Sequence, residues 1–272
     1  MNIPAAKQGM WQPAGIPVLL YHGVSGPGIG PPPTREGKFW ITYLRFMDDL
    51  ERIQCGNYRV VPLREFWWPP NDPTRPPLVG VTFDDGNVTD YTVAFPLLQE
   101  LGFRADFFIN TATVGSPGYL TWDQIGEMHH AGMSFQSHSH NHVDLSHLPP
   151  ATLRWQVGHS RQVIEDRLGE PVEFLSVPYG LINQRVREAA LEAGYGAVCT
   201  SRNWPARLGR NKISRVCIHA PTSRHEFEGL LARRISPYAL RSLREAMLYL
   251  PKQILLRLNP ASLTVQELGG QE

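Results

Sequence analysis

The chain has 272 residues, of which 42% are hydrophobic and 19% charged, and its formal net charge is +1. This composition is typical of a folded protein with a sizeable core, and the small net charge argues against a dedicated nucleic-acid-binding protein. The three cysteines are odd in number and lack metal-type spacing, so we expect no disulfide framework. Neither a secretory signal nor a membrane-spanning apolar run is present, so we expect a cytoplasmic protein.

Short apolar runs alternate with segments of helical periodicity along most of the chain. The predicted strands are 16–22, 58–62, 79–85, 105–109, 134–137, 173–176, 197–200 and 215–219. The predicted helices are 39–53, 90–101, 121–130, 151–168, 184–193 and one that begins at 223. This alternation predicts an α/β fold with a parallel sheet wrapped by helices.

Two adjacent carboxylates end the predicted strand 79–85. Asp84 and Asp85 follow an apolar run, and Gly86 allows the chain to turn away at once. Neighbouring carboxylates repel each other, so a cation or a shared proton is needed to hold them together. An Asp-Asp-Gly turn taken alone is also compatible with a structural role.

The histidines are concentrated in one region. Six of the ten lie between His129 and His147, and residues 137–142 read Ser-His-Ser-His-Asn-His. Core packing does not explain this density, whereas imidazoles beside a carboxylate are ligands that zinc and similar ions prefer. In parallel barrels the site is built at the carboxyl ends of the strands. The candidates that share this position are His22, Asp84, Asp85, His138, His142, Tyr179 and His219.

Three segments resemble motifs of the polysaccharide deacetylase family, the NodB-homology group of carbohydrate esterase family 4. Residues 82–86, Thr-Phe-Asp-Asp-Gly, match its first motif, and residues 138–145, His-Ser-His-Asn-His-Val-Asp-Leu, are similar to its second. Residues 177–180, Val-Pro-Tyr-Gly, resemble its third. The resemblance covers about residues 16–227 and implies a distorted (β/α)7 barrel.

The resemblance also implies a reaction, the metal-dependent removal of an acetyl group from an N-acetylated poly- or oligosaccharide, lipid-linked sugars included. Asp85, His138 and His142 would hold one divalent ion, zinc or else Co²⁺, Mn²⁺ or Ni²⁺. Asp84 would act as general base on the water that the ion activates. The expected partner is thus an N-acetylated carbohydrate.

One position departs from the family pattern. The third motif usually carries an arginine that holds the catalytic aspartate, and Ser176 occupies that position here. Serine cannot form a bidentate pair, so Asp84 must be oriented by another group or be less well tuned. Members that act on bacterial poly-N-acetylglucosamine are similar in lacking this arginine. The fourth motif is not recognisable.

Several further roles stay open. The backbone N–H of Tyr179 would be an oxyanion donor, unless Tyr179 serves core packing alone. Asp144 is placed to be a hydrogen-bond partner of a metal-bound imidazole. The general acid is expected to be His22, because Leu-Leu-Tyr-His resembles the fifth motif moved to the front of the chain. His219 is the alternative, and either histidine could be structural instead.

We expect three parts: a loose lead-in over 1–15, the catalytic domain over 16–229, and a C-terminal amphipathic helical extension over 230–272. Between 230 and 258 the extension has six basic residues and one acid, so it either packs on the barrel or rests on anionic lipid at the membrane surface. The six basic residues are Arg233, Arg234, Arg241, Arg244, Lys252 and Arg257.

Two alternatives to the deacetylase remain: a hydrolase of small amides or formamides, and a catalytically degenerate member that binds a glycan without cleaving it.

Overall fold

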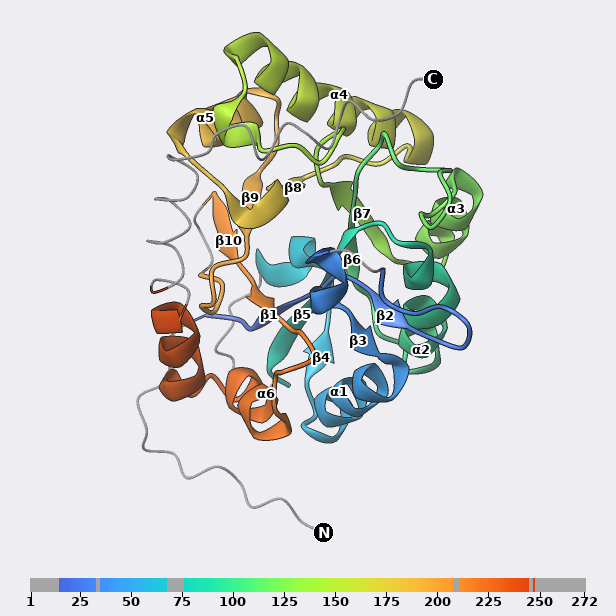
Figure 1. Cartoon of the computed structure of the whole chain (residues 1–272), viewed down its shortest axis with the longest axis vertical. Coiled ribbons are helices and arrows are strands. Elements are labelled where there is room, and N and C mark those ends of the chain that lie inside the picture. The colour runs from blue at the N-terminus through green and yellow to red at the C-terminus, as the bar shows by residue number, and fades with distance from the viewer. Residues whose placement is uncertain (1–14, 33–34, 68–75, 208–210, 245–246, 248–272) are drawn as a thin grey trace.

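The computed structural model describes residues 15–32, 35–67, 76–207, 211–244 and 247. One large parallel sheet lies at the centre of the molecule, and helices surround it (Figure 1). A separate small sheet pairs β2 (Val24–Ser25) with β3 (Ile41–Thr42). The strands of the large sheet are β1 (Val18–Tyr21), β4 (Arg59–Val60), β5 (Leu78–Asp85), β6 (Asp106–Ile109), β7 (Ser134–Ser137), β8 (Phe174–Ser176), β9 (Ala197–Thr200), β10 (Lys212–Ser214) and β11 (Val216–Cys217).

The large sheet curls toward a closed barrel. Its strand order is β10-β9-β8-β7-β6-β5-β1-β11, with β4 beside β5. The two end strands, β10 and β11, are separated in the chain by a single residue, Arg215. Because one pairs with β9 and the other with β1, the two ends of the sheet must adjoin at Arg215. The predicted distorted barrel is therefore confirmed.

Six helices cover the outside of the barrel in the described part of the chain, and several short turns join them to the strands. The helices are α1 (Tyr43–Cys55), α2 (Phe95–Glu100), α3 (Trp122–His130), α4 (Pro150–Leu168), α5 (Gln184–Glu192) and α6 (Arg224–Leu231), and residues 235–244 are helical as well. The turns are η1 (Arg35–Phe39), η2 (Leu63–Trp67), η3 (Asp90–Ala94), η4 (Leu145–His147) and η5 (Pro178–Gly180). None of the helices that the structure describes is long and apolar enough to cross a membrane.

Local sequence signals account for most helix boundaries. The predicted capping box at the start of α3 is present, since the Gln124 N–H donates to Thr121 Oγ1 and the Thr121 N–H donates to Gln124 Oε1. The α1 helix begins at Tyr43 and not at residue 39, because the Thr42 hydroxyl caps it by accepting from the Arg45 N–H. The predicted helix 90–101 begins with the π-helical turn η3.

The end of the domain differs from the prediction in three respects. The predicted strand 215–219 is divided at Arg215, because β10 and β11 belong to opposite ends of the sheet, and His219 lies beyond β11. The expected domain boundary at 229/230 falls inside α6. Arg241, expected on a lipid-facing surface, is buried and bonds through Nε to Glu226 Oε1 at 2.6 Å. Much of the extension, including Lys252 and Arg257, lies outside the described residues.

Side chains on the strands alternate between the barrel interior and the layer beneath the helices. The outer layer is apolar and includes Phe83 and Phe107, whose rings stack with centroids 4.8 Å apart. The interior holds an apolar cluster that includes Phe108. It also holds buried polar residues, Asp84 and Arg215 among them, near the carboxyl ends of the strands. The polar end of the interior is where the candidate site lies.

Candidate active site

Asp85, His138 and His142 converge at the carboxyl edge of the barrel. Asp85 ends β5, and the two histidines follow β7. Asp85 Oδ1 lies 3.4 Å from His138 Nε2 and 3.3 Å from His142 Nε2, and among the described residues this oxygen has no hydrogen-bond partner. Bonds of about 2.0–2.2 Å to a tetrahedral zinc ion place neighbouring ligand atoms about 3.4 Å apart. The two spacings from Asp85 therefore fit such an ion, and all three donor atoms lie within 4.8 Å of one another.

Several residues of this region have left-handed backbone conformations. Among the six described non-glycine residues with positive φ, four lie here: Asp85 (80°), Ser139 (66°), His142 (54°) and Tyr179 (60°). Residues that carry a Cβ adopt this conformation at a cost in free energy, and such residues cluster at functional sites. At Asp85 the positive φ breaks the alternation of the strand, so its side chain can lie at the same edge as that of Asp84.

The His138 ring is fixed by the next strand. Its Nδ1 donates a hydrogen bond to the Ser176 carbonyl oxygen at 2.9 Å, which leaves the Nε2 lone pair free to face Asp85. Burial alone would raise the pKa of Asp85, but the two histidines beside it hold that pKa well below its usual range. Asp85 is therefore ionised. Burial alone would lower the pKa of His138, but the neighbouring Asp84 and Asp85 raise it, so a metal ion bound here would compete with a proton for Nε2.

Asp84 is held by a buried arginine that the sequence analysis did not identify. Arg215 donates from Nη1 to Asp84 Oδ1 and from Nη2 to Asp84 Oδ2, both at 2.7 Å, and only 1% of its side chain is exposed. The Ser176 hydroxyl donates to Asp84 Oδ2 at 2.9 Å and accepts from Arg215 Nη2 at 2.6 Å. Arg215 thus forms the bidentate pair that Ser176 cannot form. The available signal was a lone arginine within an otherwise apolar predicted strand.

The surroundings of Asp84 keep it ionised. Burial by itself would raise its pKa, but the positive charge of Arg215 lowers that pKa below its ordinary value. Asp84 Oδ2 lies 3.9 Å from His138 Nε2, so Asp84 borders the three converging donor atoms. Its two oxygens bond to a guanidinium, whereas Asp85 Oδ1 faces two imidazoles.

His22 lies beside the two carboxylates. The pairing of Tyr21 with Phe83 places His22 level with Asp84 on the neighbouring strand. The His22 ring stacks on Phe39 at 5.0 Å, and its buried Nδ1 makes no hydrogen bond within the described residues. Burial lowers the pKa of His22, against the opposing effect of the nearby aspartates.

His219 lies beyond β11 at the same barrel edge. Its ring Nδ1 is 3.3 Å from the Cys217 carbonyl oxygen, and its backbone N–H donates to Thr222 Oγ1. Burial lowers its pKa, and the positive charge of Arg241 lowers it further. His219 thus has Arg241 and Glu226 as charged neighbours, whereas His22 has Asp84 and Asp85 as well as Arg215.

Tyr179 and Asp144 have clear places in the structure. Tyr179 is 53% exposed and its ring meets the His142 ring at 4.8 Å, so core packing alone does not explain this residue. Asp144 was expected to support a metal-binding imidazole, but it caps η4 by accepting from the Ser146 N–H and lies 2.8 Å from His147 Nδ1. The partner of His138 is the Ser176 carbonyl and not Asp144.

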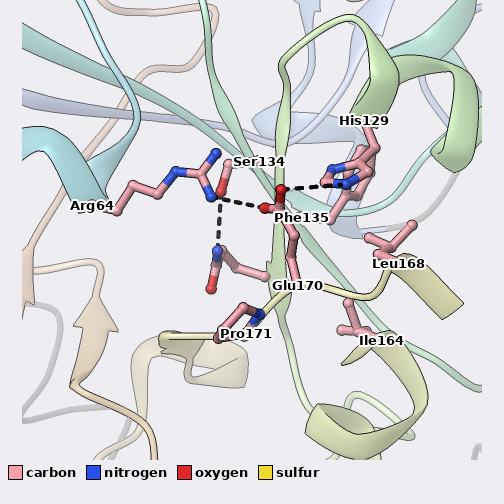
Figure 2. Close-up of a pocket in the computed structure, with 9 residues that line it drawn as sticks. Arg64, His129, Ser134, Phe135, Ile164, Leu168, Glu170 and Pro171 are labelled. Carbon is pink, nitrogen blue, oxygen red and sulfur yellow. Dashed lines mark hydrogen bonds and ion pairs between the residues drawn. The ribbon is translucent and has the colours of Figure 1, made fainter. Parts of the chain in front are cut away.

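A small hollow elsewhere in the barrel is separate from this site. It lies at the start of β7, where Arg64 bonds to Glu170 at 2.9 Å and His129 Nε2 is 3.9 Å from the same carboxylate (Figure 2). Ser134, which begins β7, lines the hollow, whereas His138 follows the last residue of that strand. The hollow therefore lies toward the amino end of the strands, opposite the candidate site.

Comparisons with known proteins agree with the motifs. The polysaccharide deacetylase family model matches residues 71–198. A protein of Bacillus subtilis (strain 168), YxkH, whose name assigns it to the polysaccharide deacetylases, is 26% identical over 68% of this chain and 63% of its own length. The poly-beta-1,6-N-acetyl-D-glucosamine N-deacetylase of Staphylococcus aureus (strain MSSA476) is 24% identical over 57% of this chain and 60% of its own length. The match thus spans less than two thirds of either relative.

Solved structures share the fold. The Streptococcus pyogenes deacetylase PplD, solved with acetate, has a TM-score of 0.71 at 26% identity and matches 81% of this chain and 98% of its own. IcaB from Ammonifex degensii has a TM-score of 0.66 at 23% identity and matches 81% of this chain and 97% of its own. The predicted resemblance to the polysaccharide deacetylase family is confirmed by the family model together with the match to YxkH.

Proposed function

We propose that this chain, whose residues 71–198 match the polysaccharide deacetylase family model, is a metal-dependent hydrolase that removes acetyl groups from N-acetylated sugars. The observation that carries this proposal is the different partners of two adjacent carboxylates. Arg215 binds both oxygens of Asp84, while Asp85 Oδ1 faces His138 and His142. One aspartate is thereby suited to be a base and the other to be a ligand.

The divalent ion would be held by Asp85, His138 and His142. Two imidazoles and one carboxylate suit zinc, and Co²⁺, Mn²⁺ or Ni²⁺ can use the same donors. When bound, the ion would activate a water molecule and polarise the acetyl carbonyl. The chain's own residues would accept the proton of the water and donate a proton to the leaving amine.

Asp84 would accept the proton of the attacking water. Its pKa is kept low by Arg215, so it is ionised at neutral pH and able to act as a base. The hydrogen bonds from Arg215 and Ser176 fix the direction of the carboxylate, and a carboxylate oxygen has further lone pairs with which to accept a proton. A bond forms between the water oxygen and the acetyl carbon, the C–N bond breaks, and acetate leaves.

The released amine needs a proton, and His22 is our candidate for the donor. It lies level with Asp84, and burial makes its protonated form more acidic by lowering its pKa. The N–H of Tyr179, whose backbone is left-handed, would donate to the oxygen of the attacked carbonyl. These roles are the ones that the motifs implied.

The substrate proposed is an N-acetylated polysaccharide or oligosaccharide. The Staphylococcus aureus relative is named for the deacetylation of poly-N-acetylglucosamine, which supports a substrate of this class. The alternative of a degenerate glycan-binding protein was favoured by the missing motif arginine and by the unrecognisable fourth motif. Arg215 supplies the same contact to Asp84, so the first reason for the alternative is removed.

Two variants separate the roles of Asp84 and the ligands. Asp84→Asn is expected to keep one metal ion per chain while acetate release from N-acetylglucosamine oligomers falls by about two orders of magnitude or more. His142→Ala is expected to lose both the ion and the activity. His147→Ala, at an exposed histidine of the same segment, is the matched control and is expected to change neither. Loss of the ion from Asp84→Asn would reverse the roles of the two aspartates.

A further inference from the structure

Three rings form a cluster beside the candidate metal site. Trp155 and His159 lie one turn apart on α4 and stack with centroids 4.9 Å apart and planes at 12°. The His140 ring stands nearly perpendicular to both, at 5.0 Å from Trp155 and 4.8 Å from His159. Trp155 is nevertheless 49% exposed, so a large part of the indole faces solvent.

This cluster is joined directly to the segment that carries the metal-binding histidines. His140 lies between His138 and His142 in the chain. The backbone N–H of His140 donates to Gln156 Oε1, and its ring Nδ1 is 2.7 Å from Thr111 Oγ1. Because a helix that follows a strand in a barrel starts at the carboxyl edge of the sheet, the second turn of α4 lies near the rim where the site is built. Trp155 is therefore at the border of the site.

We propose that Trp155, supported by His159 and His140, forms a subsite that stacks against a second sugar unit of the substrate, next to the unit whose amide is cleaved. This inference rests on the proposed function and adds to it a preference for chains over single sugars. An aromatic face carries a partial negative charge, which attracts the C–H groups on one side of a pyranose ring. After deacetylation the same face also attracts the ammonium of a glucosamine unit.

The rings are well arranged for this use. Stacking on His159 and contact with His140 restrict the orientation of the indole before any ligand arrives, so little conformational entropy is lost on binding. Neighbouring Asn141 is exposed as well and offers an amide for hydrogen bonds with sugar hydroxyls.

The kinetic test uses the metal-loaded full chain with N-acetylglucosamine and with its β-1,4- and β-1,6-linked pentamers. Trp155→Ala is expected to raise KM for the preferred pentamer about three- to tenfold with kcat unchanged, and to leave the rate on the single sugar unchanged. Trp155→Phe, which keeps an aromatic face, is expected to restore most of the affinity. Leu191→Ala, at an exposed apolar residue of α5, is the control and is expected to behave as wild type. Equal losses on pentamer and single sugar, with a loss of metal, would show that Trp155 only supports the His138–His142 segment and would overturn the proposal.

A binding measurement keeps the test independent of catalysis. The indole N–H signal of Trp155 in an NMR spectrum is assigned by its loss in Trp155→Phe and followed while either pentamer is added. We expect it to shift with a pentamer and to shift little with N-acetylglucosamine at equal concentration. If wild type released no acetate but the signal shifted, the proposed function would fail and the subsite would stand. An unmoved signal with both pentamers would refute the subsite.

Discussion

Asp84 and Asp85 are neighbours in the chain, and the structure gives each a different chemistry. Asp84 follows the strand alternation into the barrel, where it meets Arg215 and Ser176. Asp85 has a φ of 80°, which turns it toward His138 and His142 at the rim. The pair can therefore provide a base and a ligand without one residue performing both tasks. Ser176 contacts both parts of the site, because its hydroxyl donates to Asp84 and its carbonyl oxygen orients the His138 ring that faces Asp85.

The first prediction concerns Arg215. Arg215→Met removes the positive charge that keeps the pKa of Asp84 low, so that pKa rises. A base is active only when deprotonated, so the acidic limb of the pH profile of kcat/KM is expected to move to higher pH, with a lower plateau. Arg224→Met, which removes an exposed arginine paired with Asp48, is the matched control. An unshifted acidic limb in Arg215→Met would show that Asp84 is not the group that titrates there.

The second prediction distinguishes the two candidate acids. His22→Ala is expected to lower kcat on an amide far more than on an activated acetate ester, because the ester's leaving group needs no proton. His219→Ala is expected to affect both substrates alike, since His219 bonds to the chain near β11 and lies close to Arg241. The measurement is the ratio of amide to ester turnover in each variant. A selective loss in His219→Ala would transfer the acid role to that residue.

Among the elements, those with strong local signals were the ones that the sequence predicted well. Thr121 caps the start of α3 as predicted. Gly169, in a left-handed conformation, ends α4 as predicted. Residues 134–137 form β7 as expected. The division of the last predicted strand at Arg215 could not be read from periodicity, because it depends on which distant strands pair on either side.

The same distinction holds for the site. Asp85, His138 and His142 were found because a short motif carries them, and the structure places them together. Arg215 reaches Asp84 across the barrel from 131 residues away in the chain, so no local pattern could pair them. Asp144 was expected to be a hydrogen-bond partner of a metal-bound imidazole, but its carboxylate caps its own turn at η4 instead.

The third prediction concerns the opposite end of the barrel. Asp106, the first residue of β6, is fully buried, and its Oδ2 accepts from the Leu63 N–H at 2.9 Å. Burial raises its pKa from 3.8 to about 7. In the unfolded chain the group loses its proton near the lower value, so its contribution to stability is present in acid and is lost as pH rises toward 7.

Asp106→Asn is therefore expected to be more stable than wild type at pH 8, by up to a few kcal/mol, and to show a flatter pH dependence of the free energy of unfolding. The asparagine oxygen can still accept from the Leu63 N–H. Urea unfolding at pH 5 and pH 8 measures the effect, with Asp166→Asn, at an exposed position of α4, as the control. A variant that is less stable than wild type at pH 8 would contradict this account of Asp106.

At the scale of the whole molecule, the helix over 235–244 leaves apolar side chains in solvent. Arg241 fixes this helix to the barrel through Glu226 and through Thr222 Oγ1 at 2.8 Å. With Arg241 turned inward, Leu240 and Leu243 are exposed by 59% and 55%. Exposed Arg244 adds a positive charge nearby. We propose that this surface rests on anionic lipid, which would bring the enzyme to membrane-associated sugars.

The fourth prediction tests that surface with liposomes. The double variant Leu240→Asp/Leu243→Asp is expected to sediment less than wild type with anionic vesicles, because it replaces apolar contact with negative charge. Leu44→Asp, at a leucine of α1 that is 73% exposed, is the matched control and is expected to sediment like wild type. Neutral vesicles are expected to bind all forms weakly. Equal sedimentation of wild type and the double variant would leave the helix a structural element only.

The most direct test of the account as a whole is acetate release from N-acetylglucosamine oligomers by the full chain, measured before chelation, after it and after zinc is restored. We predict that wild type releases acetate, that removal of the ion abolishes release, and that one equivalent of zinc per chain restores it. Asp85, His138 and His142 supply the three donor atoms on which this expectation depends. Acetate release that continues undiminished in the metal-free protein would contradict the account.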